Sequence, residues 1–312
     1  MENLILSFNV VAPLFLTMVL GYLLKYLKIL DQHTVDVMNK ATFKVFLAVL
    51  LFYNVYTSDL EAVFDIKLIL YAAIGVITLF LILCVLIPII EKDNRKRGVM
   101  IQGIFRSNFV IFGIPIATSI YGEGNIGITT MLIATIVPLF NVLAVIALEI
   151  FRDSKINIKK IAKGIVTNPL ILGSFTGICF LVAKIQLPTA IMLTVKDIAK
   201  IATPLGLILL GASFSFSDVK KYKKEIILIV ISKLIIVPCI MIPISIYLGI
   251  RGIALLTLTI IFGAPTGVSI FQMAKQMDGD SDLAAQFIVF TSFFCIITMF
   301  LWIYILKTFS LI

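Results

Sequence analysis

The stretch FRSNFVIFGIPIATSIYG, residues 105–122, is apolar enough for most of a membrane span, yet it carries Gly113 and Pro115 near its middle. A related pattern lies 150 positions later, where Phe112-Gly113-Ile114-Pro115 recurs as Phe262-Gly263-Ala264-Pro265. Hydrophobic segments that glycine and proline interrupt at matching places in two halves of a chain are the best sequence indication of a transporter's binding site.

The composition is that of a polytopic membrane protein. Of the 312 residues, 61% are hydrophobic, whereas a soluble domain has about 45–50% apolar residues. The net charge of +9 lies mostly in short loops between apolar runs, which is typical of cytoplasmic loops, so nucleic acid is not an expected partner. The four cysteines are far apart within apolar runs and the chain has one histidine, so we expect no disulfide, no metal site and no cofactor.

The apolar runs predict an all-α protein with ten transmembrane helices. A helix needs about 20 apolar residues to cross the hydrocarbon core, and backbone groups in lipid must pair within the helix. The first run has no small-residue cleavage site, so we expect a retained span. The ten predicted spans are 4–24, 37–57, 67–90, 99–121, 126–151, 165–184, 190–215, 225–249, 252–275 and 283–307.

The loop charges predict the orientation. With the N-terminus outside, four basic loops fall on the inner side: Lys25 to Lys28, Lys92 to Arg97, Arg152 to Lys163 and Lys220 to Lys224. Because cytoplasmic loops are enriched in Lys and Arg, we expect a multi-pass protein of the cell membrane, most simply a bacterial inner membrane, with both termini outside.

The first spans of the two halves also match. Pro13-Leu14 corresponds to Pro169-Leu170, and Gly21 corresponds to Gly177, an offset of 156 positions. Five spans in each half make the second half enter the membrane in the opposite orientation. We therefore predict two inverted five-helix repeats, residues 1–157 and 158–312; the alternative is chance similarity between apolar segments.

Proline in these two helices predicts breaks. Proline removes a backbone donor and clashes with the preceding turn, so we expect the fourth and ninth helices to break near Pro115 and Pro265. The freed N–H groups at the start of each second half-helix would favour a carboxylate. The alternative is a simple proline kink.

Polar residues near these breaks form the predicted substrate-binding set. Asn108 and Gln272 are favoured because amides are costly to bury without partners, and Lys233 is a charge well inside a span. For Lys233 the alternative is an amine that snorkels to the inner surface, and the same alternative applies to Arg106, which is one helical turn inside its span. The set is Asn54, Asn108, Gly113, Pro115, Ser119, Asn141, Lys233, Pro265, Thr266, Ser269 and Gln272.

These segments resemble the auxin efflux carrier family of plant PIN carriers and bacterial organic-acid permeases, within the bile-acid-type transporter superfamily. The similarity covers nearly the whole chain and is carried by Asn108 through Gly122, Pro265 through Lys275 and Pro204 through Ala212. It implies that the broken fourth and ninth helices cross at Pro115 and Pro265. It also implies a dimerising scaffold of spans one, two, six and seven, and a moving unit of the other spans. Ala72 and Val76 stand where PIN carriers have Asp and Lys, which favours a bacterial carrier over an auxin carrier.

We therefore expect a secondary transporter of the elevator type that carries a small organic anion, such as a carboxylate or an auxin-like acid. A sodium-coupled symporter of the bile-acid type and an anion channel are the alternatives. An intramembrane enzyme is not expected, because the chain has no His-Glu-x-x-His or Gly-x-Ser-x-Gly motif.

Overall fold

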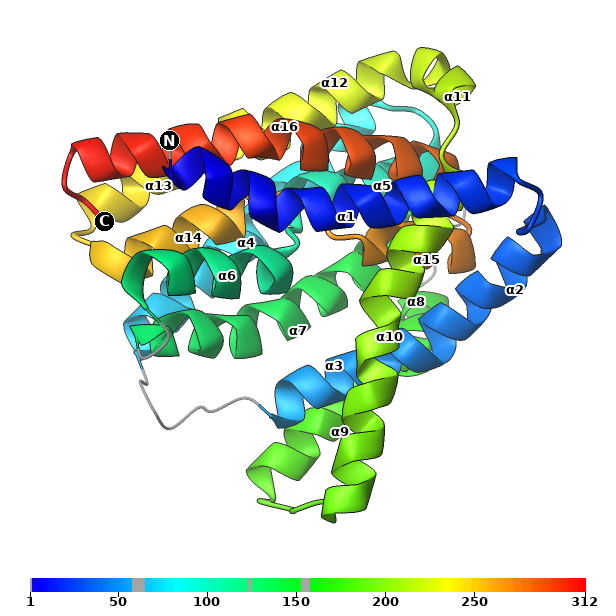
Figure 1. The fold of residues 1–312 in the computed structure, drawn as a ribbon, viewed down its shortest axis with the longest axis horizontal. Helices are drawn as coiled ribbons and strands as arrows, with labels where there is room; N and C mark the ends of the chain where they lie inside the picture. Colours follow the sequence, from blue (N-terminus) through cyan, green and yellow to red (C-terminus); the bar gives the residue numbers. More distant parts are fainter. Residues whose placement is uncertain (1, 58–64, 123–124, 153–157) are drawn as a thin grey trace.

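The computed structural model describes residues 2–57, 65–122, 125–152 and 158–312, and within these ranges the regular structure is entirely helical (Figure 1). Residues 153–157 lie outside them, and these include part of the predicted basic loop and the predicted end of the first repeat at residue 157. Each of the ten predicted spans overlaps helix in the structure, although several of them, such as 99–121, 165–184 and 252–275, also include non-helical residues.

The helices of the first half begin with one long element and include two interrupted ones. They are α1 (Glu2–Tyr26), α2 (Gln32–Ala41) with a π-helical turn (Thr42–Phe46) and α3 (Leu47–Tyr56), α4 (Ile66–Ile90), α5 (Asn94–Phe105), α6 (Phe109–Tyr121) and α7 (Gly127–Ile150). The second half follows a short helix, α8 (Ile158–Val166). Its helices are α9 (Pro169–Val182), α10 (Thr189–Ser213), α11 (Phe216–Lys221), α12 (Lys223–Ile231) with a π-helical turn (Ser232–Ile236) and α13 (Val237–Tyr247), α14 (Gly252–Gly263), α15 (Ser269–Gln276) and α16 (Ser281–Thr308).

Among the described residues, six helical stretches are long and apolar enough to cross a membrane by length and composition. They are Phe8–Tyr26, Ile66–Ile90, Asn94–Tyr121, Gly127–Ile150, Lys223–Tyr247 and Ser281–Thr308, and Pro169–Val182 and Gly252–Gly263 are shorter apolar helices. Many large apolar side chains on these helices face outward, as expected where the surroundings are lipid rather than water.

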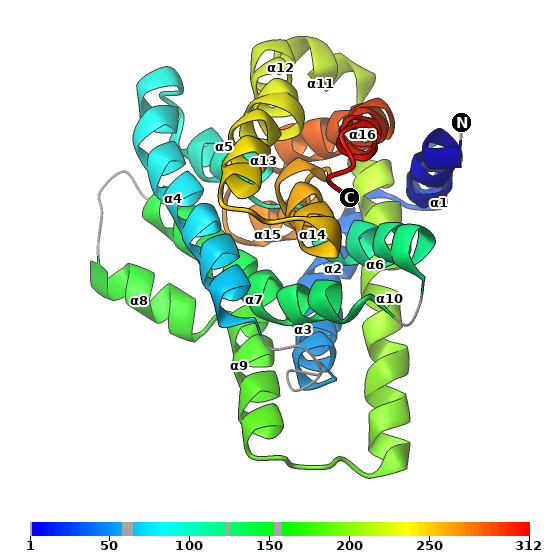
Figure 2. The same cartoon turned by 90° about the vertical axis from the view of Figure 1, so that its left-hand side faces the viewer.

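The helices pack in two groups. The first group is α1, α2–α3, α9 and α10, in which α1 packs on α10 and α3 packs on α9 and α10; Figures 1 and 2 show α3, α9 and α10 extending together below the rest of the molecule. Glycines permit this close packing, since a side chain at Gly21 would meet the backbone of Ile208, and one at Gly177 would meet the backbone of Phe52. The second group is α4–α7 with α12–α16.

Two helices of the second group are interrupted in similar ways. The 12-residue helix α5 ends at Phe105 and α6 begins at Phe109. The 12-residue helix α14 begins at Gly252, 158 positions after the start of α5, and ends at Gly263; α15 begins at Ser269. The two interruptions are therefore residues 106–108 and 264–268.

The predicted break at Pro115 is wrong, whereas the break at Pro265 is confirmed. Helix α6 is continuous through Gly113 and Pro115, and the chain is interrupted about two turns earlier. Arg106 leaves the helix with an extended conformation (φ −87°, ψ 137°). The following Ser107 and Asn108 are residue types whose side chains compete with helical hydrogen bonds.

The Phe-Gly-x-Pro motif recurs at an offset of 150, but its two copies occupy different places in the structure. Pro265 lies within an interruption, whereas Pro115 is inside a half-helix and exposed. A proline within a membrane helix loses one hydrogen bond, and neighbouring groups can satisfy the freed carbonyl. Gly113 has a packing role, because a Cβ there would lie 2.9 Å from the ring of Phe109.

Candidate functional site

The two interruptions touch each other. The backbone N–H of Asn108 donates a hydrogen bond to the carbonyl oxygen of Pro265 at 2.8 Å. The crossing point is thus Asn108 and Pro265, and not Pro115 and Pro265 as the family resemblance implied. Because α6 and α15 start beside this bond, the N-terminal ends of two half-helices are brought to one place in the interior.

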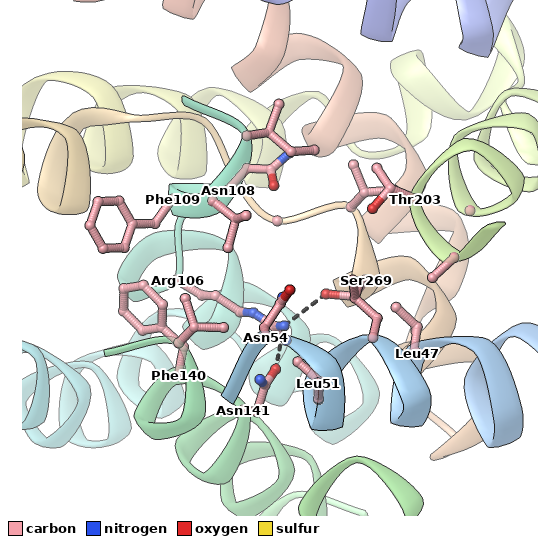
Figure 3. Close-up of a pocket in the computed structure, with 18 of the residues that line it drawn as sticks. Leu47, Leu51, Asn54, Arg106, Asn108, Phe109, Phe140, Asn141, Thr203 and Ser269 are labelled. Atoms are coloured by element: carbon pink, nitrogen blue, oxygen red, sulfur yellow. Dashed lines mark hydrogen bonds between the residues drawn. The ribbon is translucent and has the colours of Figure 1, made fainter. Parts of the chain in front are cut away.

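A cavity of about 110 Å³ lies at this crossing. Both helix groups line it, since Asn54 on α3 and Thr203 on α10 come from the first group and the residues of the interruptions come from the second. Figure 3 shows Asn54, Arg106, Asn141 and Ser269 converging from four different elements. The polar residues that line the cavity are Asn54, Arg106, Ser107, Asn108, Asn141, Thr203, Ser269 and Gln272.

Arg106 is the central charge of this cavity. Its guanidinium Nη2 donates to Asn141 Oδ1 at 2.6 Å and to Ser269 Oγ at 2.7 Å, and its Nη1 donates to Met273 Sδ at 2.9 Å. The side chain is only 6% exposed. Arg106 therefore does not snorkel to the inner surface, which was the alternative open to it from the sequence, because acceptors on α7 and α15 hold the guanidinium in the interior.

No carboxylate offsets this charge within the described part of the chain. The cavity lining there contains neither Asp nor Glu, and the ion pairs found there join other residues. Burying a cation without a partner is expensive. An anion in the cavity would offset this free-energy cost. A guanidinium suits a carboxylate in particular, because the two planar groups can form paired hydrogen bonds.

The two half-helix N-termini add to this positive potential. The first N–H groups of a helix have no acceptor within it. The side chain of Asn108 does not cap α6, and Val268, before α15, has no polar atom with which to cap it. Phe109, Val110 and Ile111 at the start of α6, and Gly267 and Val268 before α15, all line the cavity. Both helix dipoles therefore present partial positive charge to it.

Five of the eleven predicted site residues line the cavity, namely Asn54, Asn108, Asn141, Ser269 and Gln272. Pro265 contributes the carbonyl at the crossing. Thr266 faces away, with its hydroxyl 2.8 Å from that of Thr291. Ser119, like Pro115, is exposed on α6, and neither these two residues nor Gly113 lines the cavity.

Lys233 lies apart from the cavity lining. It is in the π-helical turn between α12 and α13 and is 0% exposed. Its Nζ has no hydrogen-bond partner among the described residues. Lys233 is not one of the residues that line the cavity at the crossing. The structure therefore does not group Lys233 with Arg106.

Arg106, Ser107 and Thr203 were missed as site residues. The tripeptide Arg106-Ser107-Asn108 interrupts an apolar run with three polar residues, and this was a usable signal for a break. Thr203 gave no signal, because only the packing of α10 against α3 and α15 brings it to the cavity.

Two polar contacts join the helix groups beside the cavity. Gln272 Nε2 donates to the carbonyl of Gly206 on α10 at 3.0 Å. One turn further along α15, Lys275 Nζ lies 2.6 Å from Asp36 Oδ1 on α2. Partial burial raises the pKa of the Asp36 carboxyl, but the hydrogen bond and charge of Lys275 outweigh it, and the pKa lies below its usual value. The carboxylate is thus ionised at neutral pH, and the pair persists there.

Comparison with known proteins agrees with this architecture. The family described as membrane transport protein matches residues 6–163 and 154–303. An uncharacterized transporter of Methanothermobacter thermautotrophicus (strain Delta H) is 23% identical over 300 residues, which cover 95% of this chain and 97% of the relative. This multi-pass membrane protein therefore belongs to the membrane transport protein family, which is the auxin efflux carrier family that its motifs resemble.

Proposed function

We propose that this transporter carries a small organic anion, whose carboxylate binds Arg106 at the crossing of the two interrupted helices. The observation that carries the proposal is a guanidinium that is 6% exposed and has no carboxylate partner among the described residues. A carboxylate would complete the hydrogen bonding of Arg106 and lie at two helix N-termini, and each of these interactions favours negative charge.

The size of the cavity favours a short carboxylate over an auxin-like acid. An apolar cavity of about 150 Å³ accommodates benzene, and the cavity here is about 110 Å³. A cavity of this size favours a ligand of about six non-hydrogen atoms or fewer.

The fold also supports an alternating-access mechanism. The equal lengths of α5 and α14 are what two inverted five-helix repeats would give. In this arrangement the chain would span the cell membrane ten times and have both termini outside. The first helix group would form a fixed, dimerising scaffold, and the second would move as an elevator. The substrate cavity lies between the groups, so a sliding motion would carry the bound anion across.

The test is uptake by purified protein in proteoliposomes loaded with a short carboxylate. Exchange of radiolabelled carboxylate that saturates at millimolar concentration or below would support a carrier. Currents far above carrier turnover would indicate a channel, and a requirement for a sodium gradient would indicate a sodium symporter. Absence of both binding and exchange for all short carboxylates would overturn the proposal.

Replacing the Asn108 side chain tests whether it contributes to carboxylate binding. In Asn108→Ala we expect carboxylate affinity to fall about tenfold, as for one lost hydrogen bond to a charged group. The fold should persist, because the bond to Pro265 uses the backbone N–H. Isothermal titration measures the affinity, and thermal unfolding provides the control. Unchanged affinity would remove this side chain from the site.

Tethering α2 to α15 tests the elevator motion. Cys179 and Cys239 are exposed, so the double variant Asp36→Cys with Lys275→Cys needs a background without the four native cysteines. A flexible bifunctional thiol reagent should then abolish exchange while leaving carboxylate binding intact, because the tether joins the two helix groups outside the cavity. Normal exchange in fully cross-linked protein would contradict relative motion of the groups, and reduction of a cleavable tether should restore transport.

A further inference from the structure

One buried acceptor atom in the cavity lining has no donor among the described residues. Gln272 is 1% exposed, and the hydrogen bond from its Nε2 to the Gly206 carbonyl sets the orientation of its amide. Its Oε1 is left buried with no hydrogen-bond partner within the described part of the chain. An orphaned buried acceptor of this kind requires a donor from a ligand or from water.

The other orphaned atoms of the lining can donate. Asn141 Oδ1 is occupied by Arg106, and Asn141 Nδ2 is buried without a partner, as is the hydroxyl of Ser107. Among the described lining residues, the cavity therefore combines donors suited to a carboxylate with one buried amide oxygen that lacks a partner, and a carboxylate oxygen cannot satisfy that acceptor.

Building on the proposed anion transport, we propose that the substrate is a small 2-hydroxycarboxylate. Its carboxylate binds Arg106 with Asn141 and Ser107, and its hydroxyl donates to Gln272 Oε1. Gln272 is three residues, or about one turn, after Ser269 on α15. The side chains of Gln272 and Ser269, the latter bonded to Arg106, therefore lie on the same face of that helix. A hydroxyl on the carbon next to the carboxylate spans such a short separation.

Other donors fit less well. The ammonium of an amino acid would face the Arg106 charge, and no Asp or Glu among the described lining residues offsets it. A second ionised carboxylate would place its oxygens against the Gln272 oxygen and be repelled. A hydroxyl is neutral and small, and the three-carbon hydroxy acids have six non-hydrogen atoms, which suits a cavity of about 110 Å³.

The experiment compares four acids with the same three-carbon skeleton: lactate, propionate, pyruvate and alanine. They place a hydroxyl, a methylene hydrogen, a carbonyl oxygen and an ammonium beside the carboxylate. We expect purified protein to bind lactate roughly tenfold more tightly than propionate, as one additional buried hydrogen bond allows, and to bind pyruvate and alanine no better than propionate.

Gln272→Leu should remove the preference. Its affinity for lactate should fall to that of propionate, whereas its affinity for propionate should stay within a factor of about three. Gln276→Leu is the matched control, since it makes the same change on α15 at a position outside the cavity lining, and it should keep the preference.

The outcomes separate this inference from the proposed function. Equal binding of lactate and propionate by the native protein would overturn the hydroxy-acid inference and leave anion transport standing. Binding of neither acid would count against both. The comparison among the four acids needs only the native protein, so a Gln272 variant that failed to fold would not prevent a decision.

Discussion

Arg106→Gln is expected to weaken carboxylate binding by at least an order of magnitude and therefore to impair transport. The guanidinium is the cavity's buried charge, held by Asn141 and Ser269, and glutamine keeps polar atoms there without the charge. Removing one partner of a buried charge pair costs about 2–5 kcal/mol, which is roughly 30- to 4,000-fold in Kd. Isothermal titration with the best-bound short carboxylate measures the loss.

Two further variants show that the effect belongs to the site. Arg106→Lys keeps the charge but lacks the planar fork, so we expect an intermediate affinity. Arg95→Gln, on the same helix α5 but bonded to the Asp278 carbonyl outside the cavity, should bind normally. Because the native guanidinium has no carboxylate partner among the described residues, ligand-free Arg106→Gln should unfold at the same temperature or higher. Native affinity in Arg106→Gln would refute the proposed anion site.

Hydropathy predicted the helices well because it depends on short-range composition. The fourth apolar run, for example, is helical over Asn94–Phe105 and Phe109–Tyr121, close to the predicted 99–121. The second broken helix was placed correctly, since Pro265 lies in an irregular segment. What composition could not give is how two such helices cross, which depends on contacts between distant residues.

The first break was misplaced because proline is an ambiguous signal in a membrane helix. Pro115 stays helical while Arg106, Ser107 and Asn108 do not. The reason is that the crossing provides an acceptor for the Asn108 N–H and the neighbouring helices provide acceptors for the Arg106 guanidinium, whereas an apolar continuation gains nothing by unwinding. A matching four-residue motif then suggested an incorrect alignment between the halves.

The site was predicted in part for a similar reason. Asn108, Ser269 and Gln272 are near the interruptions in sequence, so local reasoning found them. Asn54 and Asn141 were found because amides are rare in apolar spans. Arg106 was left out of the predicted set because its distance from the loop allowed snorkelling, and only the acceptors on α7 and α15 show that it turns inward.

Lys233→Met is expected to stabilise the protein. The lysine side chain is 0% exposed and its Nζ has no partner among the described residues. A neutral buried amine without acceptors costs about 1–3 kcal/mol, and a charged one costs several kcal/mol. Methionine has a similar unbranched length and no such requirement, so the thermal unfolding temperature in detergent should rise by several degrees.

Lys44→Met is the matched control for this prediction. Lys44 lies in the other π-helical turn but is exposed, so the same substitution there should leave the unfolding temperature nearly unchanged. Since Lys233 does not line the cavity, carboxylate affinity should also be unchanged.

A lower unfolding temperature would mean that Lys233 has a partner in the membrane, such as a bound anion or water. An affinity loss as large as that of Arg106→Gln would place the lysine in the substrate site after all. A Lys233→Met protein that is stable and binds carboxylate but no longer transports it would instead indicate that Lys233 is needed for the movement between the two helix groups. Its buried amine would then find an acceptor in the second conformation of the transporter.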